Sequence, residues 1–382
     1  MRKSPEACRG CGEEALEALG PAGLRPGSVT SDSRLHPTPA FLHRCRVCGL
    51  LQKLGTPGLQ TEASAIYEAY APHLLSDGRE QVVFDPAGLP VTRTARALGA
   101  CLPELPARGR LLDFGCGNGA FLRSAGSQLP GWELQGLDVS DHHRAAVESI
   151  PGVSGFHAGS LAGLTGGPFD LVVAWHVVEH LQDPEAELTS LRHRLKPGGR
   201  LLISVPDVTR NPFDLAVIDH LSHFTGPGLE HLLARSGYRV LLDGRSWIHN
   251  CLTYLVEAGD ASDLPAGPPA PREPWDWLGE TLAHFESVTR DQDYVLFGTG
   301  MASIWLLGQL GRRPTVIWDE DEAKVGKALL GIPITRPWSD PFGLPMLMPF
   351  RLELATPILG RLKARSAHLS QVRFVLPKGA DL

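Results

Sequence analysis

The sequence predicts an α/β protein: a sheet with helices on both faces, a cysteine-rich segment before it and a smaller α/β unit after it. Three observations support this prediction. From about residue 110 to 256, short apolar runs alternate with helical segments, which is typical of a parallel sheet covered by helices. A shorter alternation of the same kind fills the C-terminal part of the chain. The first 55 residues or so are rich in Gly, Pro, Arg and Cys and show no long helical period.

The alternation gives an expectation for each element. Strands are expected at 110–114, 132–138, 153–157, 169–175, 200–205, 238–243 and 251–256, and helices at 119–128, 140–149, 184–195 and 228–236. The spacing of apolar residues from 62 to 101 is helical. Five prolines between 264 and 274 predict a linker. After it we expect strands at 294–297, 315–318, 345–348 and 372–376, and helices at 302–310 and 353–363.

Composition excludes several classes of protein. With 43% apolar and 20% charged residues in 382, the chain has the balance of a globular protein and not of a disordered one. The 36 Lys and Arg against 42 Asp and Glu leave a net charge of −6, which argues against a general electrostatic affinity for nucleic acid or for an anionic membrane. No apolar run is long enough to span a bilayer, and the N-terminus does not resemble a signal peptide. We therefore expect a cytoplasmic protein.

Four of the seven cysteines form two Cys-x-x-Cys pairs, each followed by glycine: Cys8 with Cys11, and Cys45 with Cys48. This spacing lets both sulfurs of a pair face one ion, so the four thiolates predict a tetrahedral, structural Zn²⁺ site. Four unrelated buried thiols and a redox pair are the alternatives. The zinc site is favoured because the segment has no apolar core of its own and needs a metal or another cross-link to stabilise it.

A glycine-rich turn follows the first expected strand of the main sheet, with Gly115, Gly117 and Gly119 in a G-x-G-x-G pattern. Glycines at the start of a helix let a ligand approach the backbone closely. The pattern also fits a dinucleotide fingerprint. Asp113, two residues before the first glycine, would repel a pyrophosphate but attract the ammonium and sulfonium of S-adenosylmethionine (SAM). Asp138, at the end of the next strand, is placed to bind two ribose hydroxyls.

Two further motifs, at 169–181 and 195–206, complete a recognisable set. With them, residues 105–258 resemble the class I SAM-dependent methyltransferases, which have a Rossmann-like fold. The resemblance implies that Asp113, Gly115 and Gly117 border the methionine part of SAM and that Asp138 holds the ribose. It implies further contacts from residues that would enclose the adenine or line the floor near the methyl group: Val139, Ser160, Leu161, Trp175 and His176. Ser160 stands where many members of the family carry an acid.

The order of the three parts resembles one group within that family, the zinc-domain sugar C-methyltransferases. The cysteine pairs look like the zinc-binding domain of that group, and the C-terminal unit, with Gly298, Gly300 and Asp319, looks like its smaller Rossmann-like third domain. The parts expected are a zinc module at 1–56, a helical connector at 57–104, the SAM-binding domain at 105–258, a Pro-rich linker at 259–274 and the C-terminal domain at 275–382.

The segment Ile218 to Thr225 resembles the family segment that carries the catalytic base. By that resemblance His220 is the base and Asp219 its acidic neighbour, while His180 and Tyr70 are further active-site groups. Val217 replaces a tyrosine of the family. A carbon acceptor beside a ketone needs such a base, whereas a hydroxyl only gains from one, and a histidine with an adjacent carboxylate suits the task.

The expected function is therefore methyl transfer from SAM to a small-molecule acceptor, a sugar or nucleotide-sugar carbon, with structural zinc. O- or N-methylation of a natural product or glycan is the alternative within the same chemistry. Two other classes stay open. A binding protein with a vestigial methyltransferase fold would show no affinity for SAM. An NAD-linked oxidoreductase that uses the loop at Gly298 and Gly300 would depend on Asp319.

Overall fold

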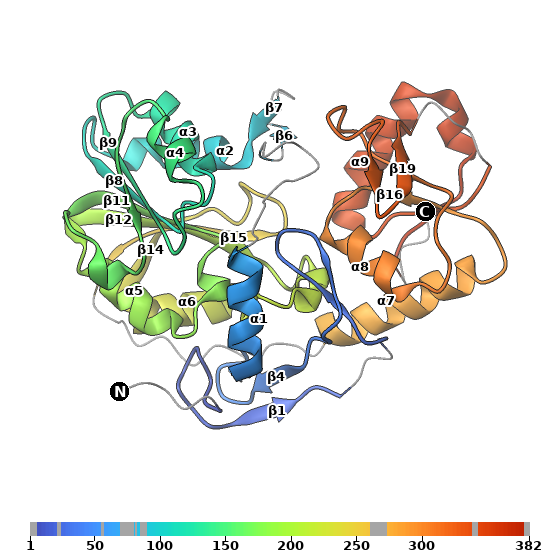
Figure 1. Ribbon diagram of the computed structural model, residues 1–382, viewed down its shortest axis with the longest axis horizontal. Helices are drawn as coiled ribbons and strands as arrows, with labels where there is room; N and C mark the ends of the chain where they lie inside the picture. The colour runs from blue at the N-terminus through green and yellow to red at the C-terminus, as the bar shows by residue number, and fades with distance from the viewer. Residues whose placement is uncertain are drawn as a thin grey trace.

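The computed structural model describes residues 6–20, 24–54, 57–68, 80, 82–84, 90–259, 273–337 and 343–377. Its largest sheet has seven strands (Figure 1). In spatial order they are β10 (Val153–Ala158), β9 (Glu133–Asp138), β8 (Arg110–Phe114), β11 (Phe169–Trp175), β12 (Leu195–Pro206), β15 (Cys251–Ala258) and β14 (Tyr238–Asp243). The pairs from β10 to β12 are parallel, and β15 runs antiparallel to both of its neighbours.

Helices cover this sheet on both faces, as the alternation predicts. The helices are α2 (Arg93–Cys101), α3 (Ala120–Gln128), α4 (Arg144–Glu148), α5 (Pro184–Arg192) and α6 (Gly226–Arg235). Neighbouring strand residues face opposite ways: Leu111 packs in one core with α2, α3 and α4, whereas Leu112 packs in another with α5 and α6. The carboxyl ends of the parallel strands therefore lie together at one edge of a three-layered domain, where ligands bind in such sheets.

Most of the expected elements of this sheet are present within one to three residues, and three at their expected bounds: β8, β11 and β14. Three expectations are wrong. The sheet is mixed, because β15 is antiparallel. The helix expected at 140–149 is only the five residues of α4. Residues 82–84 and 90–92, expected to be helical, form a hairpin of β6 (Val82–Phe84) and β7 (Pro90–Thr92).

The N-terminal segment is built from short strands that sequence reasoning did not foresee. They are β1 (Leu16–Ala18), β2 (Ser28–Val29), β3 (Leu35–His36), β4 (Leu42–Cys45) and β5 (Leu51–Lys53), followed by the helix α1 (Pro57–Glu68). β2 and β3 form a separate two-stranded sheet, whereas β1, β4 and β5 form a sheet whose last strand comes from far along the chain. This strand, β13 (Ser222–His223), pairs antiparallel with β5, with His223 opposite Leu51. This pairing joins the cysteine-rich segment to the stretch predicted to carry the base.

In its described residues, the C-terminal unit contains a six-stranded sheet and three α-helices. In spatial order its strands are β18 (Ala328–Leu329), β19 (Ile332–Thr335), β17 (Val316–Trp318), β16 (Val295–Phe297), β20 (Met346–Leu347) and β21 (Phe374–Val375). Its helices are α7 (Glu273–Thr289), α8 (Met301–Gln309) and α9 (Leu352–Arg365). The expected strands and helices are present with small shifts, whereas α7, β18 and β19 were not anticipated.

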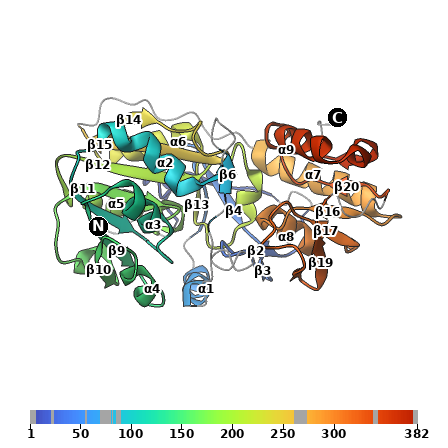
Figure 2. The same cartoon turned by 90° about the horizontal axis from the view of Figure 1, so that it is seen from above.

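The parts of the chain share their cores. Leu42 and Leu51 of the N-terminal strands, Phe213 and Val217 of the methyltransferase-like region, and Trp305 of α8 belong to one apolar cluster. Figure 2 shows β2, β3 and β4 between the large sheet and the C-terminal unit. Among the described residues, no helix combines the length and hydrophobicity needed to cross a bilayer. Residues 212–223 therefore pack against the N-terminal strands and the C-terminal unit as well as against their own region of the chain.

Candidate active site

The glycine loop after β8 has the backbone conformation that only glycine adopts easily. Gly115, Gly117 and Gly119 have φ of +74°, +48° and +80°, and Gly119 caps the N-terminus of α3. A Cβ added at Gly115 would lie 2.5 Å from Cγ2 of Val177, so the loop has no room for a side chain there. This contact also places residues 176–180, which follow β11, directly beside the loop.

Two carboxylates border the loop. Asp113 is only 2% exposed, and burial, with the charge of Asp138, raises its pKa to about 8. Such a group is mostly protonated at neutral pH, and a nearby cation would favour its ionised form. Asp138 accepts hydrogen bonds from the backbone N–H of Gly117 (2.8 Å) and of Ser140 (3.2 Å), which fixes its carboxylate at the mouth of the loop. The pair is suited to a ligand that carries both positive charge and hydroxyls.

The other residues expected at the cofactor lie at or just beyond the carboxyl ends of neighbouring strands. Val139 follows β9 and is 70% exposed, whereas Leu161, soon after β10, is only 4% exposed and packs into the core with α5. Ser160 is exposed beside it. Trp175 ends β11, and its indole lies 5.8 Å from the ring of Phe121 in α3. The strand order brings these residues to one edge of the sheet.

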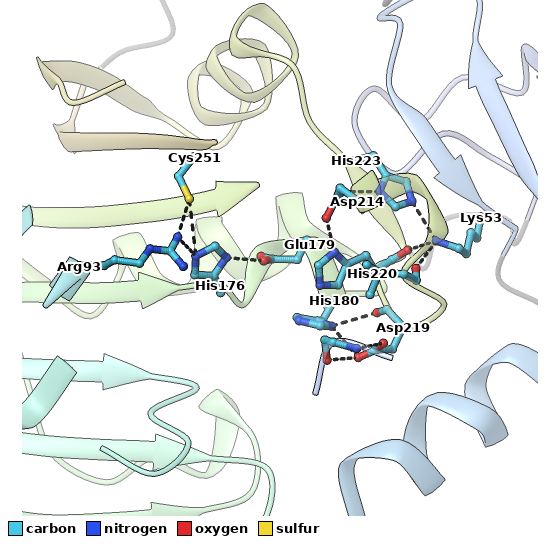
Figure 3. A network of polar contacts seen from close by, with 12 residues as sticks. Lys53, Arg93, His176, Glu179, His180, Asp214, Asp219, His220, His223 and Cys251 are labelled. Carbon is cyan, nitrogen blue, oxygen red and sulfur yellow. Dashed lines mark hydrogen bonds and ion pairs between the residues drawn. The ribbon is translucent and has the colours of Figure 1, made fainter. Parts of the chain in front are cut away.

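His176 has a strained backbone, with φ +54°, and belongs to a polar cluster that was not predicted (Figure 3). Nη2 of Arg93 donates to its Nε2 (3.0 Å), so its Nδ1 carries the proton and donates to Oε1 of Glu179 (3.1 Å). The same Arg93 nitrogen lies 2.7 Å from Sγ of Cys251. Burial raises the pKa of Cys251, but the Arg93 charge and the contact with His176 outweigh it and lower the pKa below the ordinary value.

Glu179 connects this cluster to the histidines that follow. It is fully buried, and its second oxygen, Oε2, has no hydrogen-bond partner among the described residues. Burial raises the pKa of Glu179, but the hydrogen bond from His176 and the weaker interactions that act with it lower the pKa below its usual range. An ionised, incompletely paired carboxylate therefore lies between the floor residue His176 and the predicted base.

His180 is held on Nδ1 by three groups: the hydroxyl of Tyr67 (2.8 Å), the carbonyl of Asp219 (2.9 Å) and, more loosely, the carboxylate of Asp219 (3.6 Å). Burial and the neighbouring His220 lower the pKa of His180, which keeps the ring neutral. Tyr67 comes from α1, the segment from which a tyrosine was expected, but the residue predicted, Tyr70, lies outside the described residues.

His220 is oriented by a carboxylate other than the one predicted. Its Nδ1 lies 2.6 Å from Oδ1 of Asp214, and the other oxygen of Asp214 binds Nδ1 of His223 at the same distance (Figure 3). The adjacent Asp219 instead accepts from the backbone N–H (2.8 Å) and hydroxyl (2.5 Å) of Ser31. Burial lowers the pKa of His220, but the Asp214 carboxylate outweighs it and raises the pKa above its usual value.

The four cysteines of the N-terminal segment converge. Their sulfurs all lie within 4.8 Å of one another, with Cys8 and Cys48 3.4 Å apart and Cys11 and Cys45 3.6 Å apart, and none is in a disulfide. A tetrahedral Zn²⁺ with bonds of about 2.3 Å needs sulfurs about 3.8 Å apart, so the donor set fits that ion. Gly12 and Gly49, at φ +81° and +78°, make the turn that follows each pair.

In the C-terminal unit, the residues around the glycine loop hydrogen-bond to one another. Gly298 has φ +83°, and the hydroxyl of Thr299 donates to Oδ2 of Asp319 (2.8 Å). Asp319 also accepts from the backbone N–H of Asp321 (2.9 Å). Both of its oxygens are therefore engaged within the loop.

Comparison with known proteins identifies the central part of the chain. Residues 90–242 match a family described as a methyltransferase domain. This part of the chain is therefore similar to the methyltransferase domains of that family. A trans-aconitate 2-methyltransferase from Deinococcus radiodurans is 29% identical to the chain over 163 residues, or 39% of this chain and 62% of that protein. A ubiquinone biosynthesis O-methyltransferase from Cereibacter sphaeroides is 40% identical over 131 residues, or 30% of this chain and 48% of that protein.

The chain thus spans about half to three fifths of the length of these curated relatives. A solved SAM-dependent methyltransferase from Clostridium acetobutylicum is 11% identical, covers 53% of this chain and 98% of its own, and has a TM-score of 0.37, a likeness too weak to carry an argument. The matched region includes the glycine loop, Asp113, Asp138 and His176, but neither the four cysteines nor the C-terminal unit.

Proposed function

We propose that this protein transfers the methyl group of SAM to a small-molecule acceptor, and that the acceptor is a sugar, free or nucleotide-linked, methylated at carbon. The observation that supports a base-assisted reaction is the pair of Asp214 and His220, 2.6 Å apart. The His220 ring lies 4.7 Å, centroid to centroid, from the ring of His180, and no hydrogen bond between described residues engages Nε2 of His220.

Methyl transfer itself requires mainly that the acceptor be aligned with the donor, because the methyl group of a sulfonium is already electrophilic. The loop at Gly115 to Gly119, with Asp113 and Asp138, would hold SAM. A sugar carbon beside a ketone becomes a nucleophile only when a base removes its proton. His220 Nε2 would take that proton, and Asp214 would stabilise the imidazolium that forms.

The Cys8, Cys11, Cys45 and Cys48 cluster would hold one structural Zn²⁺, whose role is to stabilise the N-terminal strands. His180, positioned by Tyr67 and Asp219, would contact the acceptor. Asp219 would act through His180 rather than through His220. These assignments rest on the distances between side chains and on the resemblance of the sequence to the sugar C-methyltransferases.

The test is to incubate the protein with SAM and a panel of nucleotide-linked keto-sugars in deuterated solvent, and to locate the new methyl group by NMR and mass spectrometry. Carbon methylation with solvent deuterium entering the acceptor would support the proposal. The rate should rise with pH through the pKa of His220, which lies above its ordinary value of 6.5, since only the neutral ring is a base. His220→Ala should abolish turnover while SAM still binds.

O-methylation is the second candidate, because the relative that is 40% identical over 131 residues is named as an O-methyltransferase. A new methyl group on oxygen, without deuterium exchange at carbon, would select this alternative. Turnover unchanged in His220→Ala would remove His220 as the base in either reaction.

A further inference from the structure

A buried series of hydrogen-bonded polar side chains connects the N-terminal strands to His220. Nζ of Lys53, in β5, lies 2.9 Å from Nε2 of His223; Nδ1 of His223 lies 2.6 Å from Oδ2 of Asp214; and Oδ1 of Asp214 lies 2.6 Å from Nδ1 of His220 (Figure 3). The four residues are 2%, 1%, 0% and 4% exposed. Lys53 and His223 have no part in the function proposed so far.

The hydrogen-bond donors and acceptors of this series can be assigned one after another, starting from Lys53. A lysine ammonium has three donors and no acceptor. Nζ of Lys53 uses them on the carbonyls of Val217 (2.7 Å) and His220 (2.6 Å) and on Nε2 of His223. Nε2 of His223 must then accept, so the proton of this ring is on Nδ1 and is donated to Asp214. The remaining oxygen of Asp214 accepts from His220, which leaves Nε2 of His220 with a free lone pair.

In their contact with Asp214, the two histidines are nearly equivalent. Each places Nδ1 2.6 Å from one oxygen of the same carboxylate, and each is buried. A carboxylate favours the protonation of an imidazole that it contacts, and Asp214 could favour either ring. Lys53 makes them different, because its charge faces Nε2 of His223 and occupies the position where a second proton would bind.

We propose that Lys53 directs the catalytic proton to His220 by holding His223 neutral, so that Lys53 and His223 are positioning residues for the base. The inference rests on the proposed role of His220. The electrostatics agree with it: burial and the Lys53 charge lower the pKa of His223 to about 4, whereas that of His220 is raised.

The other charges near these groups do not reverse this conclusion. Burial lowers the pKa of Lys53 to about 7 even though the carboxylates of Asp214 and Asp219 raise it, so the ammonium that faces His223 persists up to about pH 7. Arg9 donates to the carbonyl of Lys53 and adds positive charge on the same side. Around His220, the charges are Glu179 and Asp219 on one side and His180, which is kept neutral, on the other. Among these groups, only Lys53 contacts Nε2 of His223.

The experiment is a pH titration of ¹⁵N-histidine-labelled full-length protein by NMR, with His220→Ala and His223→Gln used to assign the two rings. In the unaltered protein, His220 should titrate between pH 5 and 9 while His223 stays neutral. In Lys53→Met, His223 should become protonated in the same range, and the midpoint of His220 should move to lower pH. We expect kcat to fall about 10- to 100-fold, as for loss of one hydrogen bond to a charged group, with KM for SAM unchanged.

A double variant separates this mechanism from simple damage to the fold. Glutamine at position 223 can accept from Lys53 and donate to Asp214, but it cannot take up a proton. His223→Gln alone should therefore leave the midpoint of His220 near its original value. Adding His223→Gln to Lys53→Met should return that midpoint toward the original value, because no competing ring remains. Lys363→Met, on the exposed face of α9, is the matched lysine control and should change neither midpoint nor kcat.

The proposal is overturned if His223 stays neutral from pH 5 to 9 in Lys53→Met, or if the double variant fails to restore the midpoint of His220. If Lys53→Met does not fold, a shifted His220 midpoint in His223→Gln alone is sufficient to reject it. Failure of the proposed function is recognised separately: His220→Ala would then retain turnover, while the titration still shows whether Lys53 keeps His223 neutral.

Discussion

Asp113 should lose a proton when SAM binds. In the unliganded protein this carboxyl is 2% exposed, and burial together with the charge of Asp138 raises its pKa from 3.8 to about 8. At about 1.4 kcal/mol for each pKa unit, ionising it costs about 6 kcal/mol more than in water. An ammonium or sulfonium nearby would recover part of that cost.

The size of the effect follows from these values. At pH 7.5, a group with a pKa of about 8 is about three quarters protonated. An opposite charge within about 4–6 Å lowers a carboxyl pKa by about 1–3 units, which leaves the group about one quarter protonated or less. Binding should therefore release between about half and three quarters of a proton for each SAM bound.

Isothermal titration calorimetry measures this release directly. The binding enthalpy is recorded at pH 7.5 in buffers with different ionisation enthalpies, and the slope of one against the other gives the number of protons. S-adenosylhomocysteine, which keeps the ammonium but lacks the sulfonium charge, should release fewer. In Asp113→Asn the release should disappear and the affinity for SAM should fall.

A zero slope for the unaltered protein, or an equal slope for Asp113→Asn, would refute the reasoning. Stability offers an independent check. Because the folded protein holds this proton more tightly than the unfolded chain does, the contribution of Asp113 to the free energy of unfolding should fall as pH rises from about 4 through 8. Asp113→Asn should remove that slope, which urea denaturation at several pH values would reveal.

Three further results are expected. Cys45→Ser should lose about one zinc per chain by metal analysis and lower the melting temperature, since 1 kcal/mol is worth roughly 2–4 °C in a chain of moderate size; full metal content would contradict the site. Gly115→Ala should cost about 1–3 kcal/mol in chemical denaturation and weaken SAM binding, because its Cβ would lie 2.5 Å from Val177 at a φ of +74°. Asp214→Asn should lower kcat by about 10³- to 10⁴-fold, by analogy with the triad aspartate whose loss leaves the wrong tautomer; an unchanged rate would exclude Asp214 as the partner of His220.

The parts of the fold that could be predicted are those set by neighbours in the sequence. Strand, glycine turn and helix follow one another between residues 110 and 128, so β8, the loop and α3 are found where the pattern puts them. The direction of β15 depends on which strand it meets in space, and the apolar pattern does not contain that information. The strands β1 to β5 are two to four residues long, too short for periodicity to detect them.

Within the site, the carboxylate that contacts His220 likewise could not be predicted from the order of residues in the sequence. Asp219 is the neighbour of His220 in the sequence, but it lies in a turn and faces Ser31. Asp214, six residues before His220, contacts it from the 3₁₀ helix Pro212–Ala216. Lys53 could not have been predicted at all, because a lysine is expected at the surface unless its partners are known.

The predicted base belongs to a site that no single part of the chain can build. Asp214, His220 and His223 lie in the part of the chain that matches the methyltransferase family, but the lysine proposed to make the two histidines unequal is in β5, five residues after Cys48. That strand keeps its place through its pairing with β13 and through the cysteine cluster, whose Cys8, Cys45 and Cys48 pack into the same core as α5 and α6. If the cysteine cluster holds zinc and the glycine loop holds SAM, as proposed, loss of the metal should disturb proton transfer without preventing SAM binding, because donor binding and base positioning would then depend on different parts of the molecule.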